Sequence, residues 1–189
     1  MTQAVRGITH PNTDLDAQTF LLRVLQAREE AGLSPRFPVS YQAQVSRDET
    51  EDPLTLIWDI GRLYDPGCGN FDHHQDHSLG ATPIILAQSL DAQISVLDRY
   101  VDLADRGFFF KEPQPFPFAE TLQGLAGGIN LVHARDVERS PVYLDLLVWV
   151  ESAQVDPFGR FTEAVLPGRF HRYLAARRQE EEQARGEAS

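Results

Sequence analysis

Cysteine and long apolar runs are nearly absent from this 189-residue chain, and each absence excludes a class of protein. The single cysteine, Cys68, leaves no second thiol for an internal disulfide, so nothing indicates an oxidising compartment. No segment approaches the roughly 18 apolar residues of a membrane helix, and the first residues lack the apolar stretch of a signal peptide. We therefore expect a cytoplasmic protein that has no membrane partner.

Basic residues are also scarce, because 17 Lys and Arg face 28 Asp and Glu, for a formal net charge of -11. This balance argues against tight non-specific binding to duplex nucleic acid, which needs many cationic contacts to phosphates. It does not exclude a phosphoester substrate, because divalent ions held by carboxylates create a local site that attracts phosphate. The sequence also has no Walker-type glycine loop and no Gly-x-Ser-x-Gly nucleophile elbow.

The remaining composition is that of an ordinary globular protein. Hydrophobic residues make up 42% of the chain and charged residues 24%, and the length suits one domain. The last fifteen residues contain three consecutive glutamates and almost nothing apolar. We therefore predict a single α/β domain over residues 1–174 and a charged, flexible tail over residues 175–189.

The order of predicted elements indicates an α/β fold with a parallel or mostly parallel sheet flanked by helices. Strands are expected over residues 5–9, 39–45 and 54–60. The alternating polar pattern of the second strand is typical of a sheet edge, and the continuous apolar run of the third is typical of a central strand. The acidic stretch 48–52 between them is predicted to be a loop.

Helices are expected between the first two strands and throughout the C-terminal part. In the first helix the apolar residues recur at i, i+3, i+4, i+7 and i+8 from Ala17, with Thr13 or Asp14 as N-cap and Gly32 as its stop. The later helices are predicted over residues 83–90, 94–105, 119–134, 142–154 and 161–178. The segment 108–118 is too rich in proline for a helix, and we leave open a packed loop, a pocket lid or an oligomer contact.

The most informative segment is Phe71 to His77, which reads Phe-Asp-His-His-Gln-Asp-His. It holds three of the six histidines of the chain directly after a predicted buried strand and a Pro-Gly turn. Imidazole and carboxylate groups are ligands that borderline and hard divalent ions share. The segment therefore predicts a metal site, and the alternative is a polar surface loop.

Ligands of parallel α/β sheets gather beyond the C-terminal ends of the strands, so side chains at those ends carry the most weight. Three strand ends carry such side chains. The first, after residues 5–9, has His10, Asp14 and Asp16, the second, at the end of the run 54–60, has Asp59, and the third, after the next predicted buried strand, has Asp72, His73 and His74. A structural alternative exists for the first group, in which Asp14 caps the helix and Asp16 lies in its first turn. Asp59 ends an apolar run and needs a partner to offset its desolvation.

These residues resemble a known pattern. His10-x-x-x-Asp14-x-Asp16, the lone Asp59 and Asp72-His73-His74 are similar to the first three motifs of the DHH phosphoesterase superfamily, which includes RecJ-type exonucleases, nanoRNA hydrolases and family II inorganic pyrophosphatases.

The stretch Asp59-Ile-Gly61, Tyr64-Asp-Pro66 and Phe71-Asp-His-His-Gln75 more closely resembles the metal-dependent hydrolases of the melanocyte-proliferating-gene (Myg) family. Asp102-Leu-Ala-Asp105-Arg-Gly107 resembles their next element. The likeness covers about residues 4–107. The resemblance includes no match to the second domain that closes over substrate in nanoRNA hydrolases and pyrophosphatases.

The resemblance implies two divalent ions, usually Mn²⁺, that share a bridging carboxylate. The implied ligands are His10, Asp14 and Asp59 for one ion, and Asp16, Asp59, His73 and Asp105 for the other. His74 is then expected to face the substrate phosphate, and Asp72 to be a ligand or to orient an imidazole. Mixed histidine and carboxylate ligation suits Mn²⁺ or Mg²⁺ better than a structural zinc site, with Zn²⁺ as an alternative.

The resulting hypothesis is a metal-dependent phosphohydrolase that works by two-metal activation of water. Phosphodiesterase or exonuclease activity on short single-stranded nucleic acid or nucleotides is the leading expectation. Two alternatives remain open, a metal-binding regulatory module without turnover and a stand-alone inorganic pyrophosphatase. Homo-oligomerisation through the aromatic segment 108–118 is also left open.

Overall fold

The computed structural model describes residues 3–76 and 78–187, which form two compact units, Met1–Asp102 and Leu103–Ser189. The fold is α/β, with the sheet in the first unit, as the sequence predicts. Within the described residues no helix combines the length and apolar character needed to cross a membrane. The predicted domain boundary at residue 174 stays a prediction.

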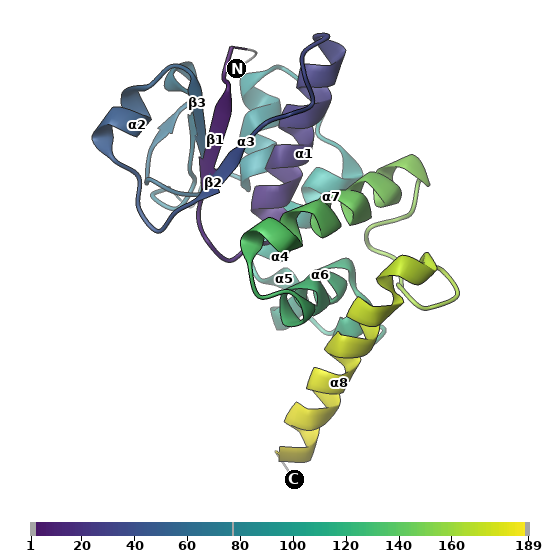
Figure 1. Ribbon diagram of the computed structural model, residues 1–189. Coiled ribbons are helices and arrows are strands. Elements are labelled where there is room, and N and C mark those ends of the chain that lie inside the picture. The colour runs from purple at the N-terminus through teal and green to yellow at the C-terminus, as the bar shows by residue number, and fades with distance from the viewer. Residues whose placement is uncertain (1–2, 77, 188–189) are drawn as a thin grey trace. The chain divides into compact units, whose positions relative to one another are not determined.

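The sheet of the first unit has five strands in the order β2-β1-β3-β5-β4 (Figure 1). The strands are β1 (Arg6–Thr9), β2 (Val39–Tyr41), β3 (Thr55–Trp58), β4 (Tyr64–Asp65) and β5 (Asn70–Phe71). All neighbours pair in parallel except β4 and β5, which are antiparallel. The mostly parallel sheet, the central β3 and the edge position of β2 confirm the prediction, although β2 ends at Tyr41 rather than at residue 45.

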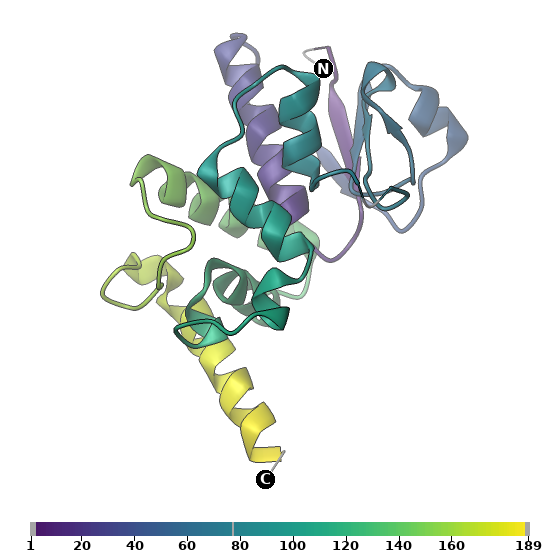
Figure 2. The same cartoon turned by 180° about the vertical axis from the view of Figure 1, so that it is seen from behind.

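Helices α1 (Leu15–Glu30) and α3 (Thr82–Ser89) lie side by side along one face of this sheet (Figures 1 and 2). Asp14 is the N-cap of α1, as predicted, and its carboxylate accepts a hydrogen bond from the Ala17 N–H. The predicted loop over residues 48–52 is wrong, because α2 (Arg47–Glu51) forms there. A capping box between Ser46 and Glu49 stabilises this short, exposed helix.

Aromatic packing fixes α1 against the sheet. The Phe20 ring stacks on Trp58 at a centroid separation of 5.0 Å and contacts Phe71 at 5.3 Å. The Trp58 indole N–H also donates a 3.0 Å hydrogen bond to the Ala17 carbonyl. Each aromatic pair contributes about 0.5–1.5 kcal/mol beyond its buried area. The loops that leave β3 and β5 are thereby held close to the start of α1.

The second unit is helical, and α4 (Val96–Asp105) leads from the first unit into it. Its helices are α5 (Phe108–Lys111), α6 (Leu122–Val132), α7 (Asp136–Ser152) and α8 (His171–Glu187), with 3₁₀ turns at Phe118–Glu120 and Gly168–Phe170. The segment 108–118 does contain one helical turn, contrary to expectation, because its first proline comes only after Lys111.

The predicted bounds of the last two helices are also wrong. Helix α7 starts at Asp136 and continues through Pro141, which we had expected to precede it. Helix α8 starts only at His171, because Pro167 and Gly168 interrupt the apolar pattern before it, and it continues through the charged segment to Glu187.

Helices α6 and α8 pack closely, and a glycine makes this approach possible. A Cβ atom placed on Gly128 would lie 2.1 Å from the carbonyl oxygen of Tyr173, whereas one on Gly127 would meet nothing closer than Arg177 at 3.7 Å. Two adjacent glycines of one helix therefore face different constraints.

We expect Gly128→Ala to destabilise the protein by about 1–3 kcal/mol, because the backbone of α8 must shift to admit the methyl group. Gly127→Ala is the matched control and should instead stabilise α6 by up to about 1 kcal/mol, since alanine has the higher helix propensity. Urea denaturation followed by circular dichroism measures both. Equal effects of the two substitutions would contradict the packing described.

Candidate metal centre

Three neighbouring parallel strands, β1, β3 and β5, end at the same edge of the sheet. His10 follows β1, Asp59 follows β3, and the pair His73 and His74 follows β5 closely. The helix start after β1 adds Asp14 and Asp16. The structure thus brings together residues that are up to 64 positions apart, as the argument from strand ends predicts.

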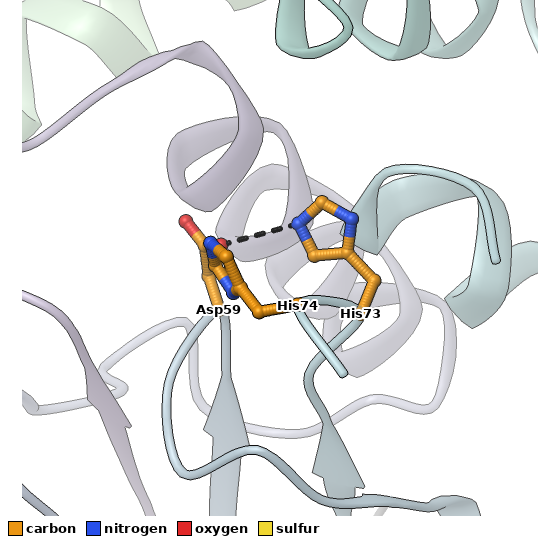
Figure 3. Close-up of side chains that lie close together, drawn as sticks. All are labelled: Asp59, His73 and His74. Carbon is orange, nitrogen blue, oxygen red and sulfur yellow. Dashed lines mark ion pairs between the residues drawn. The ribbon is translucent and has the colours of Figure 1, made fainter. Parts of the chain in front are cut away.

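Asp59 lies at the centre of this group. Its Oδ2 is 2.7 Å from Nε2 of His10, and its Oδ1 is 3.4 Å from Nε2 of His73. Figure 3 shows the His73 ring directed at the Asp59 carboxylate. The side chain is only 4% exposed, and the backbone takes the left-handed conformation with φ 58°. Such a conformation costs a non-glycine residue about 1–3 kcal/mol and is typical of functional sites.

The first donor group consists of His10, Asp14 and Asp59, with ligand atoms within 4.8 Å of one another. Asp14 has a double role, because its Oδ1 caps α1 while its Oδ2 lies 3.3 Å from Nε2 of His10. The other ring nitrogen of His10, Nδ1, is hydrogen-bonded to the carbonyl oxygen of Pro11. This contact orients the ring so that Nε2 faces the two carboxylates.

The second donor group consists of Asp59, His73 and His74, also within 4.8 Å of one another. Asp16 adds a further carboxylate, with its Oδ2 3.4 Å from Nε2 of His73. Its Oδ1 accepts hydrogen bonds from the N–H and the hydroxyl of Thr82 at 2.8 and 3.0 Å. The role of Asp16 is therefore not limited to the first turn of a helix, and Thr82 holds its carboxylate toward the histidine.

Asp72 and His74 form a separate pair beside these groups. Nδ1 of His74 lies 2.6 Å from Oδ1 of Asp72, and that oxygen also accepts the His74 backbone N–H at 3.0 Å. The Asp72 side chain is 1% exposed, whereas that of His74 is 56% exposed. An open cavity of about 450 Å³ is lined by both residues and by Asp59. The geometry favours Asp72 as the group that orients His74 toward this cavity.

Three other candidates differ in what the structure says of them. Asp105 is the exposed last residue of α4 and belongs to the second unit, so its role as a ligand stays a prediction. Asp76 is exposed and accepts hydrogen bonds from Ser78, and His77 lies outside the described residues.

The histidines outside the motifs have partners within the second unit. His133 pairs with the Tyr173 hydroxyl at 3.1 Å, and His171 pairs with the carbonyl oxygen of Leu166 at 2.9 Å. These contacts account for both side chains without a role at the site.

The carboxylates of the site favour nearby positive charge, as the pKa values of His10 and Asp59 show. Burial alone would lower the pKa of His10, but hydrogen bonds and charge from Asp14 and Asp59 outweigh it and raise the pKa to about 11. Burial would likewise raise the pKa of Asp59, yet the hydrogen bonds of His10 and His73 hold that pKa below its ordinary value. Ionised carboxylates thus face imidazoles in a largely buried cluster.

The donor set fits divalent ions. Two ligand atoms that bind one ion at about 2.1 Å, with an angle of 90–110° between them, are separated by about 3.0–3.4 Å. The pairs His10–Asp14, His73–Asp59 and His73–Asp16 are 3.3, 3.4 and 3.4 Å apart. The shorter His10–Asp59 separation of 2.7 Å is that of a charge-assisted hydrogen bond.

Sequence reasoning missed two residues that build the site. Thr82 donates hydrogen bonds to Asp16, which lies 66 positions earlier in the sequence, and no local pattern predicts such a contact. Arg62 donates its backbone N–H to Oδ2 of Asp72 at 2.6 Å and lines the same cavity. Its place between the Asp59-Ile-Gly and Tyr-Asp-Pro elements is a signal that could have drawn attention to it.

Comparison of the chain with protein-family models, curated proteins and solved structures finds no significant match in any of the three.

The raised pKa of His10 predicts how stability depends on pH in protein freed of metal with a chelator. Because the folded-state pKa of about 11 exceeds the unfolded value near 6.5, the contribution of His10 is fully present below about pH 6.5. It is lost as the pH rises toward 11. The difference in unfolding free energy between the wild type and His10→Gln should therefore narrow between pH 6 and pH 10. Urea denaturation at several pH values measures it, and a constant difference would contradict the assignment.

Proposed function

We propose that this chain is a metal-dependent phosphohydrolase of the DHH type that hydrolyses phosphoester bonds at two divalent ions. One observation carries the proposal. The two oxygens of the buried Asp59 carboxylate each face a different donor group, with His10 and Asp14 on one side and His73 on the other. A carboxylate so placed can bridge two ions.

We propose the following ligands for the two ions. His10, Asp14 and Asp59 would hold the first ion, and Asp16, Asp59 and His73 the second, with Asp105 as its further proposed ligand. When bound, such ions activate water as a nucleophile and stabilise the negative charge that develops on phosphoryl oxygens. We propose Mn²⁺ as the native ion because carboxylates dominate the donor set and no cysteine belongs to it, with Mg²⁺ and Zn²⁺ as alternatives.

His74 is the proposed substrate-facing residue. The contact of its Nδ1 with Oδ1 of Asp72 orients the ring, so that Nε2 is left to hydrogen-bond a substrate phosphate. The ring is exposed beside the buried donors and lines the cavity, which supports this proposed role. Asp72 thus has the role of a buried, charged orienting group.

The substrate we propose is a short single-stranded nucleic acid or a nucleotide. The cavity beside His74 has a volume in the range of pockets for small ligands, about 300–1000 Å³. The net charge of -11 is unsuited to a long duplex, whose binding relies on many Lys and Arg contacts.

The decisive experiment combines metal analysis with a substrate screen under Mn²⁺. Purified protein is tested on pyrophosphate, a chromogenic phosphodiester and short oligonucleotides. Replacement of orienting residues typically costs 10–100-fold, so loss of the proposed bridging carboxylate in Asp59→Asn, or of a proposed metal ligand in His73→Ala, should lower turnover by more than about 100-fold. Asp91→Asn is the matched control, because it removes an exposed carboxylate of the same unit at a left-handed position that Asn tolerates.

The outcomes separate the candidate functions. Retained turnover in Asp59→Asn would overturn the proposal. Tight metal binding with no cleavage of any of these substrates would indicate a binding module instead, and cleavage of pyrophosphate alone would indicate a pyrophosphatase.

A second prediction concerns Asp72. In Asp72→Asn one acceptor oxygen becomes a donor, so the side chain can no longer accept from both the Arg62 N–H and His74. Turnover should fall by about 10–100-fold while the bound metal is retained. Steady-state kinetics and metal content measured on the same sample test this. Loss of metal in parallel with turnover would instead make Asp72 a ligand.

A further inference from the structure

The turn from β3 to β4 has an unusual backbone. Asp59, Gly61 and Arg62 all lie in the left-handed region, with φ of 58°, 100° and 55°. Only glycine adopts this region without steric cost, so the surroundings must impose it on Arg62. A strained conformation that is held in place beside a candidate catalytic centre is a reason to ask what the Arg62 side chain does.

Asp72 holds this turn in place. Its Oδ2 accepts the Arg62 N–H at 2.6 Å, and its own N–H donates to the carbonyl oxygen of Leu63 at 3.1 Å. The other oxygen of the same carboxylate binds His74. Arg62 and the proposed substrate-facing histidine are therefore positioned by one buried group.

The side chain of Arg62 has no such anchor. It is exposed, and among residues 3–76 and 78–187 its guanidinium has no hydrogen-bond or ion-pair partner. By contrast, Arg23 and Arg6 of the same unit both pair with aspartates. A guanidinium has five donors in a planar fork that suits two oxygens of a phosphate. Arg62 therefore has its full binding capacity available.

Arg62 also lines the cavity beside His74 and Asp59, and the rest of that cavity wall is partly apolar. Val45 and Ile60 contribute apolar surface to it. Its volume of about 450 Å³ exceeds what a single phosphate needs, so a bound substrate can extend from the metal centre toward Arg62.

We propose that Arg62 binds a second phosphate of the substrate, adjacent to the phosphate that is cleaved, and so selects substrates that carry two phosphate groups. The proposal rests on the proposed function for the place of the first phosphate. It deepens that function by naming a specificity residue. The hydrogen bond from the Arg62 N–H to Asp72 fixes the position of Arg62 relative to His74.

The test uses Mn²⁺-loaded protein and two probes that are not hydrolysed, methylenebisphosphonate and methylphosphonate. In Arg62→Gln the residue keeps a Cβ, so the backbone strain at this position is unchanged. The substitution removes only the positive charge and the forked donors of the guanidinium. We expect it to weaken bisphosphonate binding by about 10-fold or more, as for a lost charged hydrogen-bonding partner, and to change methylphosphonate binding less than about twofold. Arg62→Lys should restore part of the loss.

Arg99→Gln is the matched control, because Arg99 is exposed in the same unit and its side chain has no ionic partner among the described residues. It should leave both affinities unchanged. Isothermal titration calorimetry measures all four proteins, and circular dichroism verifies their folding. An unaltered bisphosphonate affinity in Arg62→Gln, an equal loss for both probes, or a wild type that does not prefer the bisphosphonate would each overturn the proposal.

The binding experiment tests the role of Arg62, and the turnover experiment tests the hydrolase function, so either proposal can fail without the other. A wild type that prefers the bisphosphonate through Arg62 but cleaves no phosphoester would refute the hydrolase function and keep the Arg62 assignment. If the wild type does cleave, Arg62→Gln should raise KM for a 5′-phosphorylated dinucleotide and leave KM for the unphosphorylated one unchanged.

Discussion

The buried carboxylate of Asp59 is the constraint on which the rest of the site depends. An ionised carboxylate that is 4% exposed loses most of its hydration and must be compensated by nearby positive charge or hydrogen-bond donors. His10 and His73 approach its two oxygens from the ends of two different strands. The strand order that places β1 and β5 on either side of β3 is therefore also what compensates the charge. The stack of Phe20 on Trp58 and the hydrogen bond from the Trp58 indole to Ala17 help to fix the helix start that carries Asp14 and Asp16 relative to this carboxylate.

The same electrostatics bear on the proposed binding of metal. Two carboxylates raise the pKa of His10 to about 11, so the cluster holds a proton strongly when no other cation is available. A divalent ion at the proposed site would supply more positive charge to the same carboxylates and would require the neutral imidazole, so proton and metal would compete for one set of atoms. Strongly shifted pKa values that arise from specific partners at a cleft are typical of functional sites. The buried acids therefore support a cation site more strongly than a polar surface loop.

Much of this arrangement follows from local sequence, and the remainder does not. The apolar run before Asp59 and the helix start at Asp14 predict strand ends and a cap, and parallel pairing then brings His10, Asp59 and His73 to one edge. The contact of Thr82 with Asp16 depends on how α3 packs beside α1, which no local pattern encodes. The late start of α8 has a similar cause, because its apolar spacing looked helical well before Pro167 and Gly168. The identity of the candidate ligands thus follows largely from the strand ends, whereas the orientation of their side chains depends on tertiary packing.

Asp59 and Asp72 illustrate two different uses of a buried acid within one site. Asp59 faces two imidazoles and supplies charge to the centre. The oxygens of Asp72 accept hydrogen bonds from the backbone N–H groups of Arg62 and His74 and contact the His74 imidazole. Asp72 therefore holds the Arg62 turn and the His74 ring. Such a group acts through its geometry, because both oxygens already have donors and a change of partner would release the turn and the ring together. The antiparallel pairing of β4 with β5 brings these two segments together. The edge strand β4, which no sequence pattern predicted, therefore helps to position Arg62 and His74 at the cavity.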